Sequence, residues 1–190
     1  MSELPSWYPG TAETKPAPMP LLRVQAFVNT RDLEDATDLL DVPETARQWL
    51  LDAGLLDGAS VLSESDLEHA RALREAIRAL IEADVPPGDE RLEPLRQLAA
   101  SHRAQLTLAE DGTIALENSG RGRLDDGLFE LLLIVHRAQH DGTWSRLKIC
   151  ANDECQWAFF DRSRNQQGNW CNMAVCGNRL KNRELRARRR

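Results

Sequence analysis

The stretch LKICANDECQWAFFDRSRNQQGNWCNMAVCGNRLK, residues 147–181, contains all four cysteines of the chain, spaced C-x4-C-x15-C-x4-C. A tight, even set of cysteines in a chain without an export signal favours a metal over disulfides. Four thiolates surround zinc tetrahedrally at about 2.3 Å each, which closes the site to water. The x4 loops are wide for such a site, and disulfides or free thiols are the alternative. We predict one structural zinc ion held by Cys150, Cys155, Cys171 and Cys176.

The segment between the two cysteine pairs is rich in aromatic residues. Gln156–Asp161 is predicted to be a short strand, and Trp170 directly precedes the third cysteine. A module of this size buries too little apolar surface to fold by packing alone, so zinc binding and folding are expected to be one event. We therefore interpret Trp157, Phe159 and Trp170 as packing residues, in preference to platforms on which nucleic-acid bases stack.

The net charge of −6 conceals two oppositely charged parts. Residues 146–190 contain eleven Lys/Arg and four Asp/Glu, whereas residues 1–145 contain 13 Lys/Arg and 26 Asp/Glu. A basic end on an acidic body is typical of a protein that binds a polyanion, although solubility is an alternative explanation. Two or three cations would offset the charge of a four-thiolate zinc, and the surplus favours phosphate contacts. The predicted nucleic-acid contacts are Arg162, Arg164, Arg179, Lys181, Arg183, Arg186, Arg188, Arg189 and Arg190.

The first twenty residues differ in composition from the rest. Met1–Pro20 carries five of the nine prolines and lacks the basic start and apolar stretch of a secretory signal, so we predict a disordered, proline-rich lead-in. No apolar run in the chain approaches the roughly 20 residues of a membrane helix. We therefore expect a cytoplasmic protein without a membrane segment.

Residues 21–142 are predicted to form a mainly helical domain. Asn29 and Thr30 are expected to cap a first helix that runs through Leu40, because apolar residues recur there at helical spacing. Pro43 suits the first turn of a second helix, which stops near Gly54.

Two further helices follow in this domain. Ser63 or Ser65 opens the third, since Ser65 and Glu68 match a capping box, and the segment Pro86-Pro87-Gly88 ends it. Glu90–Arg103 is predicted to be the fourth helix, with its leucines facing the core.

A β-hairpin and a last helix complete the domain. Residues between Gln105 and Glu117 alternate apolar and polar around Asp111-Gly112, which indicates a hairpin. Leu124–His140 returns to the helical period, and its Leu128–Val135 stretch is apolar nearly all round, as in a central buried helix. The predicted fold class is therefore mainly α with a small β-hairpin: a helical N-terminal domain followed by a small four-cysteine treble-clef or ribbon-like zinc finger, residues 143–190, with a C-terminal basic helix.

Five segments of the C-terminal region resemble the CGNR zinc-finger proteins. They are Leu147–Cys150, Cys155–Phe159, Asp161–Asn165, Trp170–Met173 and Cys176–Lys181. The preceding region, from Phe27–Thr30 through Trp49-Leu50, is similar to the helical ABATE domain that usually accompanies this finger.

The resemblance implies a bacterial stress-induced transcription regulator whose finger binds DNA. It implies that the four cysteines are ligands and that Asn178 and Arg179 belong to the signature tetrapeptide. The family often has a basic residue just before the Trp-Cys pair, where this chain has Gly168-Asn169. The phosphate contact expected on that loop would then come from Arg162, Arg164 and the basic tail.

Several functions are compatible with the sequence. We expect a DNA-binding regulator whose helical domain senses a signal, such as a small molecule, or mediates dimerisation. Arg179 either contacts DNA or braces the finger. RNA binding by a zinc ribbon with a basic tail is one alternative, and a thiol-based redox sensor that releases zinc is another. A homodimer is expected if the DNA site is two-fold symmetric, yet no dimer seam is identifiable in the sequence.

Enzymatic activity has little support in the sequence. His136 and His140 lie four residues apart, but Arg137 stands where a zinc protease would have glutamate. A glycine-rich phosphate loop and a serine nucleophile elbow are both missing, and a four-thiolate zinc has no open position for chemistry. We therefore predict that the protein is not an enzyme.

Overall fold

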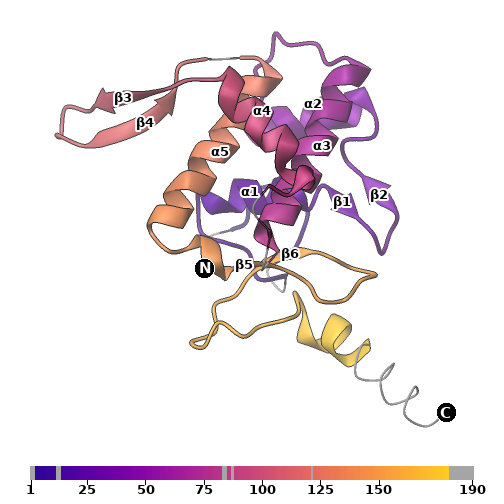
Figure 1. Cartoon of the computed structure of the whole chain (residues 1–190). Helices are drawn as coiled ribbons and strands as arrows, with labels where there is room; N and C mark the ends of the chain where they lie inside the picture. The colour runs from indigo at the N-terminus through magenta and orange to yellow at the C-terminus, as the bar shows by residue number, and fades with distance from the viewer. Residues whose placement is uncertain (1–2, 12–13, 83–84, 87, 121, 180–190) are drawn as a thin grey trace.

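The helix α1 (Leu21–Val28) lies at the centre of the fold and contacts α3, α5 and the strand β6 (Figure 1). A computed structural model describes residues 3–11, 14–82, 85–86, 88–120 and 122–179. Seven of the eight residues of α1 are buried, because an almost entirely apolar helix is stable only when it is covered on all sides. The sequence analysis did not predict this helix.

The other helices largely match the prediction. They are α2 (Pro43–Asp52), α3 (Glu64–Ile81), α4 (Glu93–Ser101, preceded by the 3-10 turn η2, Glu90–Leu92) and α5 (Leu124–His140). The capping box of α3 joins Ser63 to Asp66, which takes the place of the expected pair Ser65 and Glu68. None of the helices in the described residues has the length and apolarity that crossing a membrane requires.

The predicted first helix, running from Asn29–Thr30 through Leu40, is wrong. The chain instead forms a short antiparallel pair, β1 (Arg31–Asp32) and β2 (Thr37–Asp38). The hydroxyl of Thr30 donates to the Phe27 carbonyl and accepts from the buried Arg74 guanidinium of α3 at 3.0 Å, so it is directed into the core and does not cap a new helix. Tertiary contacts thus override a local capping pattern.

Residues 3–11 and 14–20 pack against the body, in contrast to the predicted disordered lead-in. Tyr8 and Ala17 are buried in the main core, and the Trp49 indole N–H donates to the Trp7 carbonyl at 2.7 Å. The Gln25 side chain accepts from the Ala17 N–H at 2.6 Å. Core contacts and hydrogen bonds hold the described residues of this segment, which contain no α-helix or strand, and proline already limits their freedom in the unfolded chain.

The other strands of the described residues form two hairpins, each longer than the β1–β2 pair. β3 (Ala104–Leu108) pairs with β4 (Ile114–Asn118) around the predicted Asp111-Gly112 turn, and this hairpin projects from the body (Figure 1). β5 (Leu147–Ile149) follows the 3-10 turn η3 (Trp144–Arg146) and pairs with β6 (Ala158–Phe160) at the opposite end of α5.

Strand β6 divides its side chains between two cores. Ala158 and Phe160 belong to the main hydrophobic core with the helices, whereas Phe159 packs with the four cysteines and Trp157. Successive side chains of a strand point to opposite faces, so three consecutive residues serve both cores. The zinc-finger segment and the helical domain therefore share packing and form one folded unit.

Gly127 in α5 provides a test of this packing. A Cβ atom there would lie 1.8 Å from the Leu55 carbonyl oxygen, so backbone would have to move. We expect Gly127→Ala to lower the free energy of unfolding by about 1–3 kcal/mol, despite the better helix propensity of alanine. Gly58→Ala, at a position with nothing within 4 Å, is the control. Equal urea midpoints for the two variants would contradict the close contact.

Candidate zinc centre and its basic surroundings

The four cysteines converge on one point at the end of the β5–β6 hairpin. Cys150 and Cys155 lie in the loop between the two strands, and Cys171 and Cys176 flank and enter the π-helical turn η4 (Met173–Gly177). All four Sγ atoms lie within 4.8 Å of one another, and Cys171 Sγ is 3.7 Å from both Cys155 Sγ and Cys176 Sγ. Tetrahedral thiolates 2.3 Å from zinc would be about 3.8 Å apart. The donor set fits zinc, and the cysteines are not joined by disulfides.

Each x4 loop is closed by an asparagine. The Asn152 carbonyl accepts from the N–H groups of Cys155 and Gln156 at 2.8 and 3.0 Å. The Asn172 side chain caps η4 by accepting from Ala174 N–H at 2.8 Å, and its carbonyl accepts from Cys176 N–H at 3.0 Å. These turns bring each pair of sulfurs together across four intervening residues. Sequence reasoning missed both asparagines, although asparagine just after a ligand is a turn and cap signal.

Hydrogen bonds among the four thiols shift their pKa values in opposite directions. The pKa of Cys150 is lowered because the thiols of Cys155 and Cys171, and then the Asn152 N–H, hydrogen-bond to its sulfur. The pKa of Cys155 is raised, chiefly because its thiol donates to Cys150. Neighbouring thiolates repel one another without a cation, and zinc would stabilise all four charges together.

Aromatic residues and one lysine surround the metal site. Trp157 and Phe159 are buried and Trp170 is half-buried against the same cluster, which agrees with their interpretation as packing residues. Lys15 lies 4.8 Å from the centre of the Phe159 ring and donates to the Trp170 carbonyl at 2.5 Å. The N-terminal segment thus places a cation beside a centre that is negative when it holds zinc, a contribution the sequence analysis missed.

The finger is joined to the helical domain at the outer edge of β6. The Ala158 N–H donates to Asn29 Oδ1 at 2.7 Å, and the Ala158 carbonyl accepts from Asn29 Nδ2 at 2.9 Å. The same carbonyl accepts from Gln25 Nε2 at 3.0 Å, and the Phe160 N–H donates to the Lys15 carbonyl at 2.8 Å. These groups take the place of a neighbouring strand, so both backbone groups of Ala158 and the N–H of Phe160 are paired at this edge.

Arg78 of α3 makes a second connection. Its guanidinium donates to the Val28 carbonyl at the end of α1 at 2.8 Å and to the Gln156 carbonyl in the finger. Burial lowers the pKa of Arg78, and the carboxylate of Glu75 offsets part of that effect. A buried cation therefore bridges the C-terminal end of α1 and the first zinc loop.

The predicted nucleic-acid contacts fall into three groups. Arg162 and Arg164 are exposed on the loop after β6, and Arg162 also donates to the Pro16 carbonyl at 2.6 Å. Arg179 forms an ion pair with Glu34, in the turn between β1 and β2, so it braces the finger against the helical domain. The remaining predicted contacts lie outside the described residues: Lys181, Arg183, Arg186, Arg188, Arg189 and Arg190.

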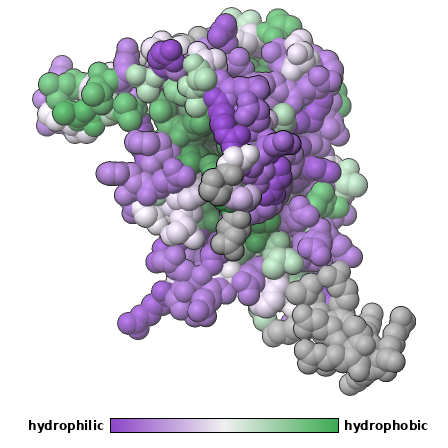
Figure 2. All heavy atoms as spheres, viewed as in Figure 1, coloured by the Kyte–Doolittle hydropathy of each residue, from purple (hydrophilic) through white to green (hydrophobic). Residues whose placement is uncertain are grey.

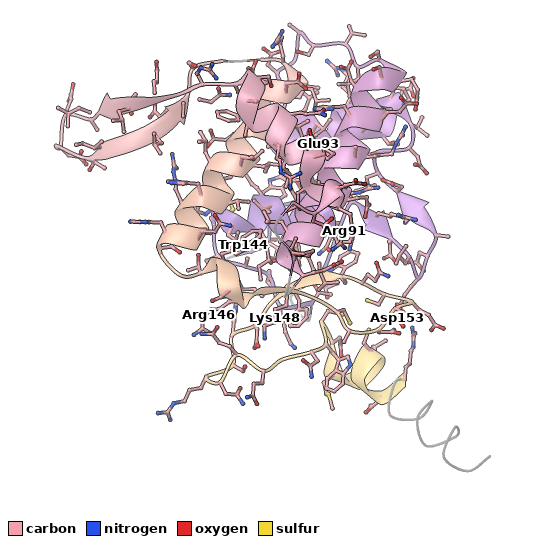
Figure 3. All side chains as sticks on the ribbon, viewed as in Figure 1. Arg91, Glu93, Trp144, Arg146, Lys148 and Asp153 are labelled. Atoms are coloured by element: carbon pink, nitrogen blue, oxygen red, sulfur yellow. The ribbon has the colours of Figure 1, made fainter. Side chains whose placement is uncertain are left out.

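Asp161 organises the loop that carries Arg162 and Arg164. Its buried carboxylate accepts from Ser163 N–H at 3.0 Å, Gly168 N–H at 2.7 Å and Lys148 Nζ at 3.2 Å. Burial alone would raise the pKa of Asp161, but the hydrogen bonds together lower it. A Cβ at Gly168 would lie 2.9 Å from the Asp161 carboxylate, so glycine suits this turn. Figure 3 shows Lys148 beside Arg146, whose guanidinium donates to the Asp161 carbonyl at 3.0 Å.

Fold and site define a helical domain fused to a four-cysteine zinc finger. The profile of the CGNR zinc finger matches residues 146–189. The profile of the ABATE family, described as "Putative stress-induced transcription regulator", matches residues 23–140, which is more than half of the chain. The chain belongs to the ABATE family. A comparison with curated proteins gave no match.

Zinc loading can be tested directly. We expect one zinc ion per chain, and we expect Cys155→Ser to lose it. Because Ala158 and Phe160 belong to the main core, this loss should lower the thermal midpoint of the whole chain rather than of the finger alone. Ala151→Ser, at an exposed position of the same loop, should keep zinc and stability. Atomic absorption and calorimetry check both; a Cys155→Ser variant with full zinc would exclude Cys155 as a ligand.

Asn29→Ala tests the junction between the two parts. The substitution leaves the buried Ala158 N–H without its partner, and we expect a loss of about 1–3 kcal/mol in the free energy of unfolding. Asn165→Ala, at an exposed loop position, should change it by less than about 0.5 kcal/mol. Urea unfolding of the zinc-loaded proteins measures both values. If Asn29→Ala lowers the free energy of unfolding as little as Asn165→Ala does, Asn29 is not important for holding the finger on the helical domain.

Proposed function

We propose that this ABATE-family chain is a non-enzymatic transcription regulator that binds duplex DNA through the basic surface of its zinc finger. The main support for this proposal is the uneven distribution of charge along the chain. Residues 146–190 contain eleven Lys/Arg against four Asp/Glu, on a body in which acidic residues outnumber basic ones two to one. Zinc acts as a scaffold in this proposal: it fixes the finger from which Arg162, Arg164 and the basic tail reach phosphates.

The aromatic residues favour duplex DNA over single-stranded RNA. Recognition of unpaired bases depends on exposed aromatic rings on which the bases stack. The five aromatic side chains of residues 143–190 are all buried or half-buried, and residues 180–190 contain none. The finger therefore lacks a stacking platform, whereas backbone contacts to a duplex need only its cations.

A sensing role for the helical domain is supported by a cavity next to the turn that carries the Glu34–Arg179 ion pair. A cavity of about 580 Å³ lies between the β1–β2 turn and α3, and its lining includes Arg31, Asp38, Arg74 and Glu75. The same turn carries Glu34, the partner of Arg179. A small charged ligand in this cavity would shift β1 and β2, and the Glu34–Arg179 ion pair would transmit the shift to the finger.

Redox sensing is a second candidate function, and a second cavity, next to the cysteines, favours it. A cavity of about 230 Å³ lined in part by Cys155, Cys171 and Cys176 gives a small oxidant access to three of the four sulfurs. Zinc release at low peroxide that a reductant reverses would support this function. Retention of zinc under conditions that oxidise other protein thiols would exclude it.

Salt dependence of DNA affinity tests the proposed interface. Arg162→Gln combined with Arg164→Gln should weaken binding to random-sequence duplex DNA, and should reduce the slope of log affinity against log salt by about two, one for each phosphate contact. Arg91→Gln with Arg96→Gln, on the exposed surface near α4, is the matched control. Fluorescence anisotropy between low and moderate salt measures all three proteins.

Deleting residues 186–190 tests the tail in the same assay. We expect a larger loss of affinity than for the loop variant, because five residues with four arginines are removed. An unchanged affinity would assign DNA binding, if present, to the loop alone. If a structured RNA displaces duplex DNA from the protein in a competition assay, the proposed ligand is RNA rather than DNA.

A further inference from the structure

The β3–β4 hairpin presents an apolar face to solvent. We propose that this face is the contact between two copies of the chain, which pack hairpin on hairpin about a two-fold axis perpendicular to the strands. The inference stands on the geometry of the hairpin and does not depend on DNA binding.

The register places four large apolar side chains on one face of the hairpin. Leu106 lies opposite Leu116, and Leu108 lies opposite Ile114. Three of them are 68–74 % exposed, and Figure 2 shows the hydrophobic surface that they form on the projecting arm. The other face carries Gln105, Thr107 and Glu117, so the hairpin has the apolar-in, polar-out pattern of a sheet that is covered on one side.

Within the part of the chain that the structure describes, the outer half of this face is left uncovered. β4 contacts α5 near the base of the hairpin, where Leu116 is half-buried, but Leu108 and Ile114 lie farther out toward the tip. A two-stranded hairpin is marginally stable alone in water and needs another layer against its apolar face. A second apolar sheet face, packed at about 10 Å, supplies that layer.

Charges at the two ends of the apolar stripe select a second copy as the partner. Glu110 and Asp111 are exposed at the tip, whereas Arg103 is exposed at the base and Arg137 reaches the middle of β4 from α5. Glu117, the acidic residue near the base, lies on the polar face. Arg137 lies against the hairpin, because its guanidinium donates to the Leu116 carbonyl. A surface with an apolar centre, an acidic end and a basic end is complementary to itself, which a two-fold interface requires.

The same charges fix the orientation of the axis. An axis parallel to the strands would place the acidic tips against each other. An axis perpendicular to the strands places each tip over the partner's base, where acids meet arginines. Each five-residue strand is about 17 Å long, so both ends of the stripe meet their counterparts in one arrangement.

Sedimentation equilibrium of the full-length, zinc-loaded protein tests the proposal over micromolar concentrations. We expect a monomer–dimer equilibrium, and Leu108→Thr combined with Ile114→Thr should raise its dissociation constant at least tenfold while keeping the β-propensity of the strands. Val61→Thr, which removes a side chain 89 % exposed elsewhere on the surface, should leave the constant unchanged. A wild-type protein that stays monomeric throughout, or a double variant that dimerises as well as wild type, overturns the proposal.

Charge reversal tests the orientation without changing the apolar face. Glu110→Arg and Arg137→Glu should each raise the dimer dissociation constant at least threefold, and the two together should restore it, because each tip again meets an opposite charge. Failure of the combined variant to recover, with zinc content equal to wild type, would overturn the tip-to-base arrangement.

Discussion

The pairing of the Asn29 amide with both backbone groups of Ala158 is the constraint on which the rest of the arrangement depends. A side-chain amide has the donor and acceptor of a peptide group, so it can complete a strand edge as another strand would. Asn29 follows the last residue of the largely buried α1, and it therefore transfers the rigidity of the main core to the finger. The finger is held in a fixed orientation, unlike a module on a flexible linker. Any signal that moves the end of α1 also moves the first zinc loop.

A metal at the four cysteines would stabilise a small core that this docking leaves incomplete. One face of β6 is committed to the helical core through Ala158 and Phe160, and only Phe159 and its neighbours remain to fill the opposite side. Four buried sulfurs and two aromatic rings cannot form a core alone, since ionised thiolates at 3.7 Å repel one another and neutral thiols pack weakly. Zinc bound to the four sulfurs would turn this cluster into the second core. Its loss would remove support from a strand that the helical domain also uses, which couples metal occupancy to the state of the whole chain.

Local signals in the sequence predicted the elements that depend on local chemistry. The cysteine spacing located the metal site, and Asp111-Gly112 located its hairpin; the bounds of α5 also agree with the prediction. The failures have a common cause in long-range contacts. Asn29 and Thr30 look like helix caps in sequence, but their side chains are used across the fold, by a residue 129 positions away in the case of Asn29. The proline-rich N-terminus likewise has no local pattern, and its order comes from pockets formed by residues far along the chain. Sequence periodicity carries no information on such partners.

The two proposed interaction surfaces, the finger and the β3–β4 hairpin, lie at different ends of the helix α5. The base of the β3–β4 hairpin lies near the N-terminal end of α5, where Asn118 donates to the Asp126 carbonyl at 2.8 Å, and the finger follows the C-terminal end (Figure 1). A 17-residue helix is about 25 Å long. A dimer formed through the hairpins would therefore carry its two fingers at the distal ends of both protomers, at a separation set by helices rather than by linkers. Because two-fold proteins read half-sites whose spacing mirrors their own geometry, such a dimer would favour half-sites at one fixed and wide spacing over adjacent ones. Shape would then contribute to target choice independently of any base contact, which suits a finger whose cations are proposed to bind phosphates.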